Sequence, residues 1–126
     1  MILPVYVNSK GNSLDMAYLC NLAHNAVNEH RAFEELPSLV IDIKRVQNIR
    51  DHFEHGAKLD GFRSDYAQLG YIVDVEEGMP RQEFIRRCFD QLGRFEKDLL
   101  NPEFSIEAIY ARLEQSKISL YHFLYS

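Results

Sequence analysis

The chain has 126 residues, of which 46% are hydrophobic and 26% are charged, and its formal net charge is −5. This length and balance predict one globular domain with its own core and exclude a disordered or fibrous protein. The excess of acid excludes a general affinity for nucleic acid and favours a partner with a basic surface.

Membrane and secretory segments are not expected. No apolar run approaches the roughly 20 residues needed to span a bilayer, and the N-terminus lacks the pattern of a signal peptide, so we expect a cytoplasmic protein without membrane contact. Cys20 and Cys88 lie 68 positions apart, without metal-ligand spacing. We predict that both are reduced residues of the core.

The N-terminal third predicts an edge strand followed by a long helix. Ile2–Val7 has strand composition, and Pro4 restricts such a strand to the edge of a sheet. After a loop, a helix starts near Asn12 or Ser13 and continues to about Glu35. Its predicted core stripe, at spacings of three and four, is Met16, Leu19, Leu22, Ala23, Ala26, Val27 and Phe33.

The middle of the chain predicts a second helix and a short strand. Pro37 precedes the helix and Gly56 ends it. Its predicted apolar face is Leu39, Ile43, Val46, Ile49 and Phe53. We expect a loop or one short helix around Ser64–Leu69, and a strand at Tyr71–Val75.

Two further helices and a strand are predicted for the last third. The third helix follows Gly78 and Pro80, with an apolar stripe of Ile85, Cys88, Leu92, Phe95 and Leu99. Ser105 caps a fourth helix that runs to about Gln115 and carries Ile106, Ile109, Tyr110 and Leu113. Ile118–Tyr125 alternates like a strand.

These elements predict a mainly α fold, with about four amphipathic helices packed as a bundle in a single domain, residues 1–126. A small antiparallel sheet formed by the N-terminal, central and C-terminal strand segments is the α+β alternative.

The densest group of chemically capable side chains is Arg50-Asp51-His52-Phe53-Glu54-His55. Arg50 followed by a polar residue, with His55 after four intervening residues, resembles the arginine-x4-6-histidine signature of HEPN domains. The resemblance implies a helical bundle, commonly dimeric, with a metal-independent ribonuclease site. In such a site His55 would transfer protons and Arg50, beside Asp51, would hold phosphate charge.

Two other interpretations of this segment compete with a ribonuclease site. His52 and His55 share a helical face and could bind a metal, but no further ligands have suitable spacing, so we predict no metal and no cofactor. Alternatively, Glu54 lies four residues after Arg50, and His55 four after Asp51, which is the spacing of ordinary surface pairs.

The leading functional hypothesis is a small acidic binding or regulatory protein that acts on a protein with a basic surface, as immunity proteins, antitoxins and phage-encoded inhibitors do. The residues assigned to this binding are Glu29, Glu34, Glu35, Asp74, Glu76 and Glu77. The alternative is a HEPN-like ribonuclease, for which RNA would be the partner. Whether the chain is an enzyme stays open, and a homodimer is compatible with both hypotheses.

Overall fold

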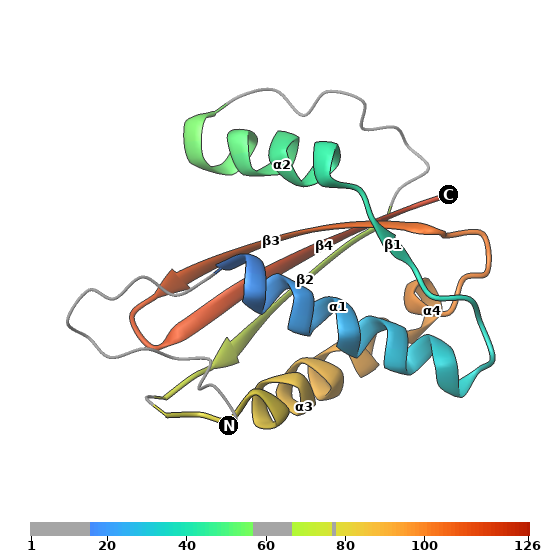
Figure 1. The fold of residues 1–126 in the computed structure, drawn as a ribbon, viewed down its shortest axis with the longest axis horizontal. Coiled ribbons are helices and arrows are strands. Elements are labelled where there is room, and N and C mark those ends of the chain that lie inside the picture. Colours follow the sequence, from blue (N-terminus) through green and yellow to red (C-terminus); the bar gives the residue numbers. More distant parts are fainter. Residues whose placement is uncertain (1–15, 57–66, 77) are drawn as a thin grey trace.

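Helices and strands alternate along the chain until it ends in a β-hairpin (Figure 1). The structure is a computed structural model, and it describes residues 16–56, 67–76 and 78–126. In chain order the elements are α1 (Met16–Phe33), β1 (Val40–Ile41), α2 (Ile43–His55), β2 (Ala67–Asp74), α3 (Arg81–Leu92), the 3-10 turn η1 (Gly93–Phe95), α4 (Glu96–Leu99), β3 (Ile106–Glu114) and β4 (Lys117–Tyr125).

The strands form one mixed sheet in the order β1-β3-β4-β2. β3 and β4 are an antiparallel hairpin, β2 is antiparallel to β4, and β1 is parallel to β3. β1 pairs only with Ile106 and Glu107 of β3. In the part of the chain that the structure describes, the rest of β3 therefore has no strand beside it on that side.

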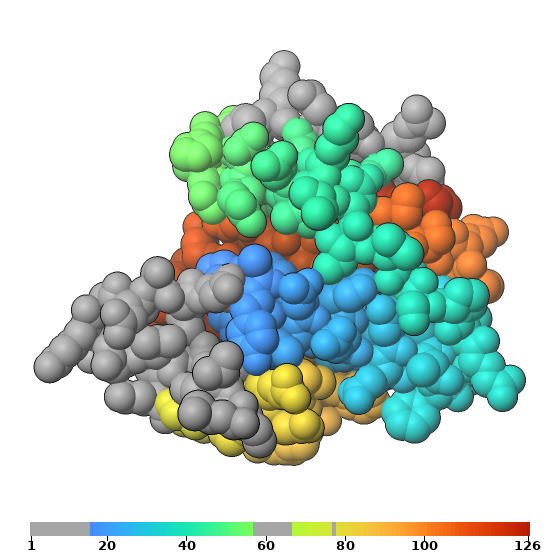
Figure 2. All heavy atoms as spheres, viewed as in Figure 1, coloured from blue at the N-terminus to red at the C-terminus, as the bar shows by residue number. Residues whose placement is uncertain are grey.

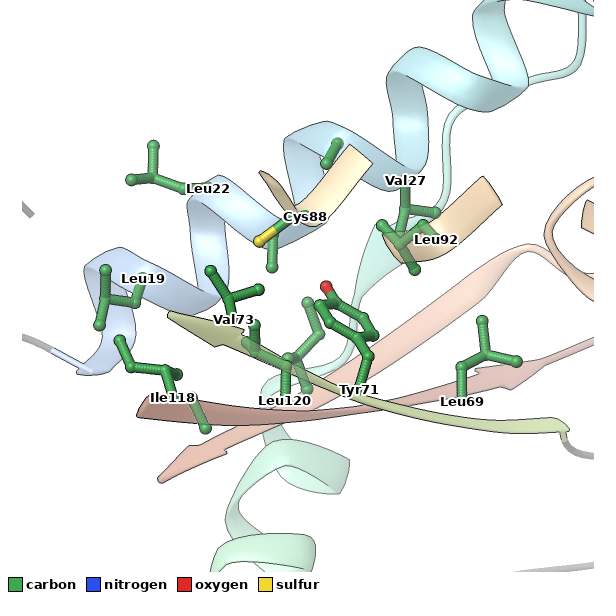
Figure 3. Close-up of a cluster of buried hydrophobic side chains, with 14 of the residues drawn as sticks. Leu19, Leu22, Val27, Leu69, Tyr71, Val73, Cys88, Leu92, Ile118 and Leu120 are labelled. Carbon is green, nitrogen blue, oxygen red and sulfur yellow. The ribbon is translucent and has the colours of Figure 1, made fainter. Parts of the chain in front are cut away.

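Helices cover both faces of the sheet (Figure 1). α1 and α3 lie on one face and enclose the larger core, while α2 lies on the other face over β3 and β4. Figure 3 shows the larger core, in which the labelled side chains are Leu19, Leu22, Val27, Leu69, Tyr71, Val73, Cys88, Leu92, Ile118 and Leu120. The smaller core centres on Ile49 and on Phe53, whose ring stacks 4.8 Å from that of Tyr110.

Local sequence determines where α2 begins and ends. The Asp42 side chain accepts a hydrogen bond from the Arg45 N–H at 3.3 Å, as an N-cap residue does. Gly56 ends the helix at a φ of 71°, a left-handed conformation that glycine adopts without steric cost. The expected C-terminus is confirmed, but the helix begins at Ile43 rather than near Pro37, and Leu39 lies before it.

The predicted helical bundle is wrong, because the fold is α+β with a four-stranded sheet. The main cause is Ile106–Gln115, which we predicted as the fourth helix and which forms β3. Both faces of β3 are covered by helices, so Glu107 to Ala111 are all buried. Apolar residues at consecutive positions fit a helical spacing as well as an alternating one, and the periodicity therefore does not distinguish them.

Other predicted elements have mixed outcomes. The strands expected at Tyr71–Val75 and Ile118–Tyr125 are confirmed as β2 and β4, and the third helix is confirmed as α3 with its extension through η1 and α4. β2 already begins at Ala67, so the loop or helix expected up to Leu69 is wrong there. The predicted N-terminal strand Ile2–Val7 lies outside the described residues.

Candidate functional site

Four polar side chains meet in the larger core beneath α1. The carboxylate of Glu107 on β3 lies between two imidazoles, with Oε1 2.5 Å from His24 Nδ1 and Oε2 2.6 Å from His122 Nδ1. On the far side of His122, Nε2 is 2.7 Å from the Tyr71 hydroxyl of β2. Glu107 and His122 are fully buried. α1, β3, β4 and β2 are therefore joined by one polar network.

Asn28 extends this network to the residue before β1. Its Oδ1 accepts from the Leu39 N–H at 2.8 Å, and its Nδ2 donates to the Leu39 carbonyl and lies 3.2 Å from His24 Nε2. An amide nitrogen can only donate, so His24 Nε2 must accept, and the proton of a neutral His24 is on Nδ1, directed at Glu107. We refer to Asn28, His24, Glu107, His122 and Tyr71 as the buried relay.

Glu107 is the carboxylate at the centre of the buried relay. Burial by itself raises the pKa of this carboxyl, but the hydrogen bonds from His122 and His24 outweigh burial, and the pKa lies below its usual range. Burial raises the pKa of Tyr71 well above its usual value, so its hydroxyl stays protonated and donates to His122. Every imidazole nitrogen of the buried relay has a partner.

This geometry makes the buried relay a structural element. Acid–base or nucleophilic chemistry needs a group that can reach a substrate, whereas Glu107 and His122 have no exposed surface and both ends of each imidazole are occupied. Sequence reasoning missed it, although one signal was present. His122 alternates with Ile118, Leu120 and Leu124 on one side of the predicted strand, which is where a buried histidine would lie.

The residues of the HEPN-like motif lie on α2, and Arg50, Asp51 and His55 are all exposed. Five positions along an α-helix correspond to a rotation of about 140°, so Arg50 and His55 face different directions. The structure therefore does not bring them together within one chain. The helical bundle that the resemblance implied is also not the fold found here.

The described residues do not provide a reactive cysteine or a metal-binding site. Cys20 and Cys88 are not joined in a disulfide, and burial raises the pKa of Cys88 to about 12, which keeps it protonated and unreactive. Within residues 16–56, 67–76 and 78–126, no group of three or more His, Cys, Asp or Glu side chains could hold a metal ion.

Five of the six acidic residues assigned to binding are described, and they separate into two groups. Asp74 is 2.6 Å from Lys117, and Glu76 forms two 3.0 Å contacts with Arg87, so ion pairs within the chain offset both charges. Glu77 lies outside the described residues. Three carboxylates at the C-terminal end of α1 are different. Glu29, Glu34 and Glu35 are exposed, and none has an ion pair with any residue that the structure describes.

Phe33 follows Glu29 by one helical turn and directly precedes Glu34 and Glu35 in the sequence, and 78% of its surface is exposed. We had placed Phe33 on the core stripe of the first helix, which is wrong. The stripe continues from Val27 to Arg31, four residues on, and Arg31 is buried there. Its guanidinium donates to the backbone carbonyls of Pro37, Leu99, Asn101 and Phe104. Phe33 consequently points outward.

An open groove of about 560 Å³ lies between the C-terminal half of α1 and α3. Its lining residues are Glu29, Phe33, Pro80, Gln82, Glu83, Ile85, Arg86 and Phe89. Phe89 meets Phe33 edge to face, with ring centroids 6.2 Å apart, and the His30 ring stacks on that of Phe89 at 3.7 Å. Figure 2 shows α1 in blue directly above α3 in yellow on this side of the molecule. We call Glu29, Phe33, Glu34 and Glu35 the acidic aromatic patch.

The sequence matches no protein-family model and no curated protein at a significant level. Among the described residues, no helix has both the length and the apolar character that crossing a membrane requires.

Proposed function

We propose that this chain is a small binding protein with a regulatory role, which acts on a protein partner through the acidic aromatic patch. The observation that carries the proposal is the exposure of Phe33 at the edge of a groove, close in sequence to three carboxylates that form no ion pair in the described chain. Exposed apolar surface rimmed by charge is typical of protein interfaces, and aromatic residues are enriched at their centres.

The charges of the patch indicate what kind of partner fits. Glu83 and Arg86, which both line the groove, form an ion pair at 2.7 Å. Among the described lining residues, Glu29 is therefore the charged side chain without an ion pair. Together with Glu34 and Glu35, Glu29 favours a partner with lysine or arginine around an apolar centre. A role like that of immunity proteins, antitoxins or phage-encoded inhibitors agrees with this arrangement, since such proteins block a target by covering its surface.

Affinity capture with matched variants tests the proposal. The tagged protein is used to capture partners from a lysate of the source organism, and the affinity of the isolated partner is then measured by calorimetry. We expect Phe33→Ala to weaken binding about thirtyfold, as the loss of an interface anchor worth about 2 kcal/mol would. The pair Glu34→Gln and Glu35→Gln should weaken it less, by an amount that decreases as salt is added.

The control removes the same number of charges elsewhere. Asp74→Asn with Glu76→Gln changes two carboxylates that are already paired within the chain, and it should leave the affinity unchanged. Equal binding by wild type and the Phe33 variant would contradict the proposal. So would metal-independent cleavage of structured RNA that His55→Ala abolishes, because that result would favour the ribonuclease.

A further inference from the structure

A second, smaller pocket lies at the other end of α1. It has a volume of about 260 Å³ and forms between α1 and α2, where both helices extend past the side of β3 that β1 leaves open. Figure 2 shows β3, in orange, in the hollow between α2 in green and α1 in blue. The lining residues are Ala17, Cys20, Asn21, Ile41, Ile43, Val46, Arg50 and Ile109.

The walls of this pocket are mainly aliphatic. Ile109 of β3 lies at the floor of the pocket. Its carbonyl accepts a weak hydrogen bond from the Cys20 thiol at 3.8 Å. Ile43 at the start of α2 is 73% exposed, although it is a large apolar side chain. An exposed isoleucine beside a hollow with aliphatic walls gives an alkyl group a place to be buried, at about 25 cal/mol for each Å² removed from water.

Arg50 provides the charge. Ile43, Val46 and Arg50 are spaced by three and four residues, so all three lie on the face of α2 that lines the pocket. The guanidinium of Arg45 forms an ion pair with Asp42 and lies over the ring of Tyr125. Arg50, by contrast, forms no ion pair with the described residues. Among the lining residues that the structure describes, Arg50 is the charged side chain and there is no carboxylate, in a chain of net charge −5.

From this combination we propose that the pocket binds an aliphatic carboxylate, with the carboxylate on Arg50 and the alkyl group between Ile43, Val46 and Ile109. The guanidinium fork matches a carboxylate in geometry and charge, and the Asn21 amide on the opposite wall supplies a second donor. The small volume selects a short branched chain. Two sources have this chemistry, namely a free short-chain acid and the C-terminal leucine, isoleucine or valine of a polypeptide.

This site is independent of the acidic aromatic patch, because it uses the first turns of α1 and the opposite sign of charge. The test is a titration of the full chain, followed by isotope-edited NMR, with 4-methylpentanoate and with its uncharged amide. A peptide ending in leucine with a free carboxylate, and the same peptide with a C-terminal amide, form the second arm. We expect the acid to shift the signals of Cys20, Arg50 and Ile109, and the amides to bind at least tenfold more weakly.

The variants that test this site are at exposed positions, so a change in ligand binding can be distinguished from a loss of folding. Arg50→Gln should weaken binding of the acid at least tenfold, and Ile43→Ser should also weaken it. Arg81→Gln is the matched control, since Arg81 is likewise exposed and has no ion pair among the described residues, and it should bind as wild type does. Tighter binding of the peptide identifies a polypeptide C-terminus as the source, and binding of the free acid alone identifies a small molecule. If neither ligand shifts these signals at millimolar concentration, or if Arg50→Gln binds both equally well, the proposal is wrong.

Discussion

Glu35 ends α1 in a backbone conformation that suits glycine. Its φ is 58°, and the Leu36 N–H donates to the Arg31 carbonyl at 2.9 Å, which is the hydrogen bond of a Schellman motif. A side chain with a Cβ is strained there by about 1 kcal/mol. No described residue forms an ion pair with the Glu35 carboxylate, so the side chain itself does not offset this strain, which agrees with a role for Glu35 in binding a partner.

We predict that Glu35→Gly raises the free energy of unfolding by about 1 kcal/mol, since glycine removes the strain at positive φ. Urea denaturation measures this, and the thermal midpoint should rise by about 4 °C. Glu35→Ala is the control, because it removes the carboxylate but keeps the strain, and its stability should equal that of wild type. Both variants should bind the partner more weakly. A less stable glycine variant would show that φ at this position is not a source of strain.

At the same scale, Arg31 and Phe33 show what the sequence could not reveal about the candidate site. Hydrophobicity alone selects Phe33 for the core and Arg31 for solvent. The structure exchanges them because four backbone carbonyls, supplied by residues 37 and 99–104, surround the Arg31 guanidinium and satisfy its donors. Three of those carbonyls are at least 68 positions away in sequence, so no local pattern predicts the exchange. The exposure of Phe33, and with it the acidic aromatic patch, follows from this long-range contact.

At the scale of elements, α2 depends on Asp42 for its first turn. Asp42 accepts from the Arg45 N–H and lies 3.2 Å from the Arg45 guanidinium. We predict that Asp42→Ala destabilises the fold by about 1 kcal/mol, because it removes the N-cap. Asp42→Asn keeps the capping oxygen without the charge and should cost only a few tenths of that. Chemical denaturation of the three proteins tests the order, and equal stability of the alanine and asparagine variants would assign the effect to the ion pair instead.

The sequence predicted elements well where only one face of an element is buried. α1, α3 and β2 have one buried and one exposed face, and their periodicity was recognisable. β3 lies between α1 on one face and α2 on the other, so it has no polar face and was mistaken for a helix. β1 has only two residues and exists because the Val40 and Asp42 N–H groups donate to the carbonyls of Ser105 and Glu107, more than 60 positions away. Such pairing has no local signal.

At the scale of the whole molecule, the buried relay connects α1 and the residue preceding β1 to all three longer strands. Its central carboxylate is held by His122 and His24, and disrupting it loosens helix and sheet together. Glu107→Gln leaves one acceptor oxygen for two imidazole N–H donors and places an amide donor against one of them. We predict a loss of about 3 kcal/mol in the free energy of unfolding at neutral pH, because two buried hydrogen bonds to a carboxylate are weakened and one buried donor is left without an acceptor.

The ionisation of Glu107 should also make the free energy of unfolding depend on pH. The pKa of Glu107 in the folded chain lies below the ordinary value of 4.5, so the unfolded chain takes up the proton first as the pH falls. The stabilisation is therefore fully present above about pH 4.5 and is lost as the pH falls through the lower, folded pKa. Wild type should lose stability steeply across this acid range, and Glu107→Gln should lose less.

Glu83→Gln is the matched control, because the hydrogen bond from Arg86 also lowers the pKa of Glu83, but on an exposed surface where the effect on stability is small. Urea denaturation at a series of pH values measures all three curves. If the Glu107 variant followed the wild-type curve while the Glu83 variant did not, the acid sensitivity of the fold would come from its surface and not from the buried relay.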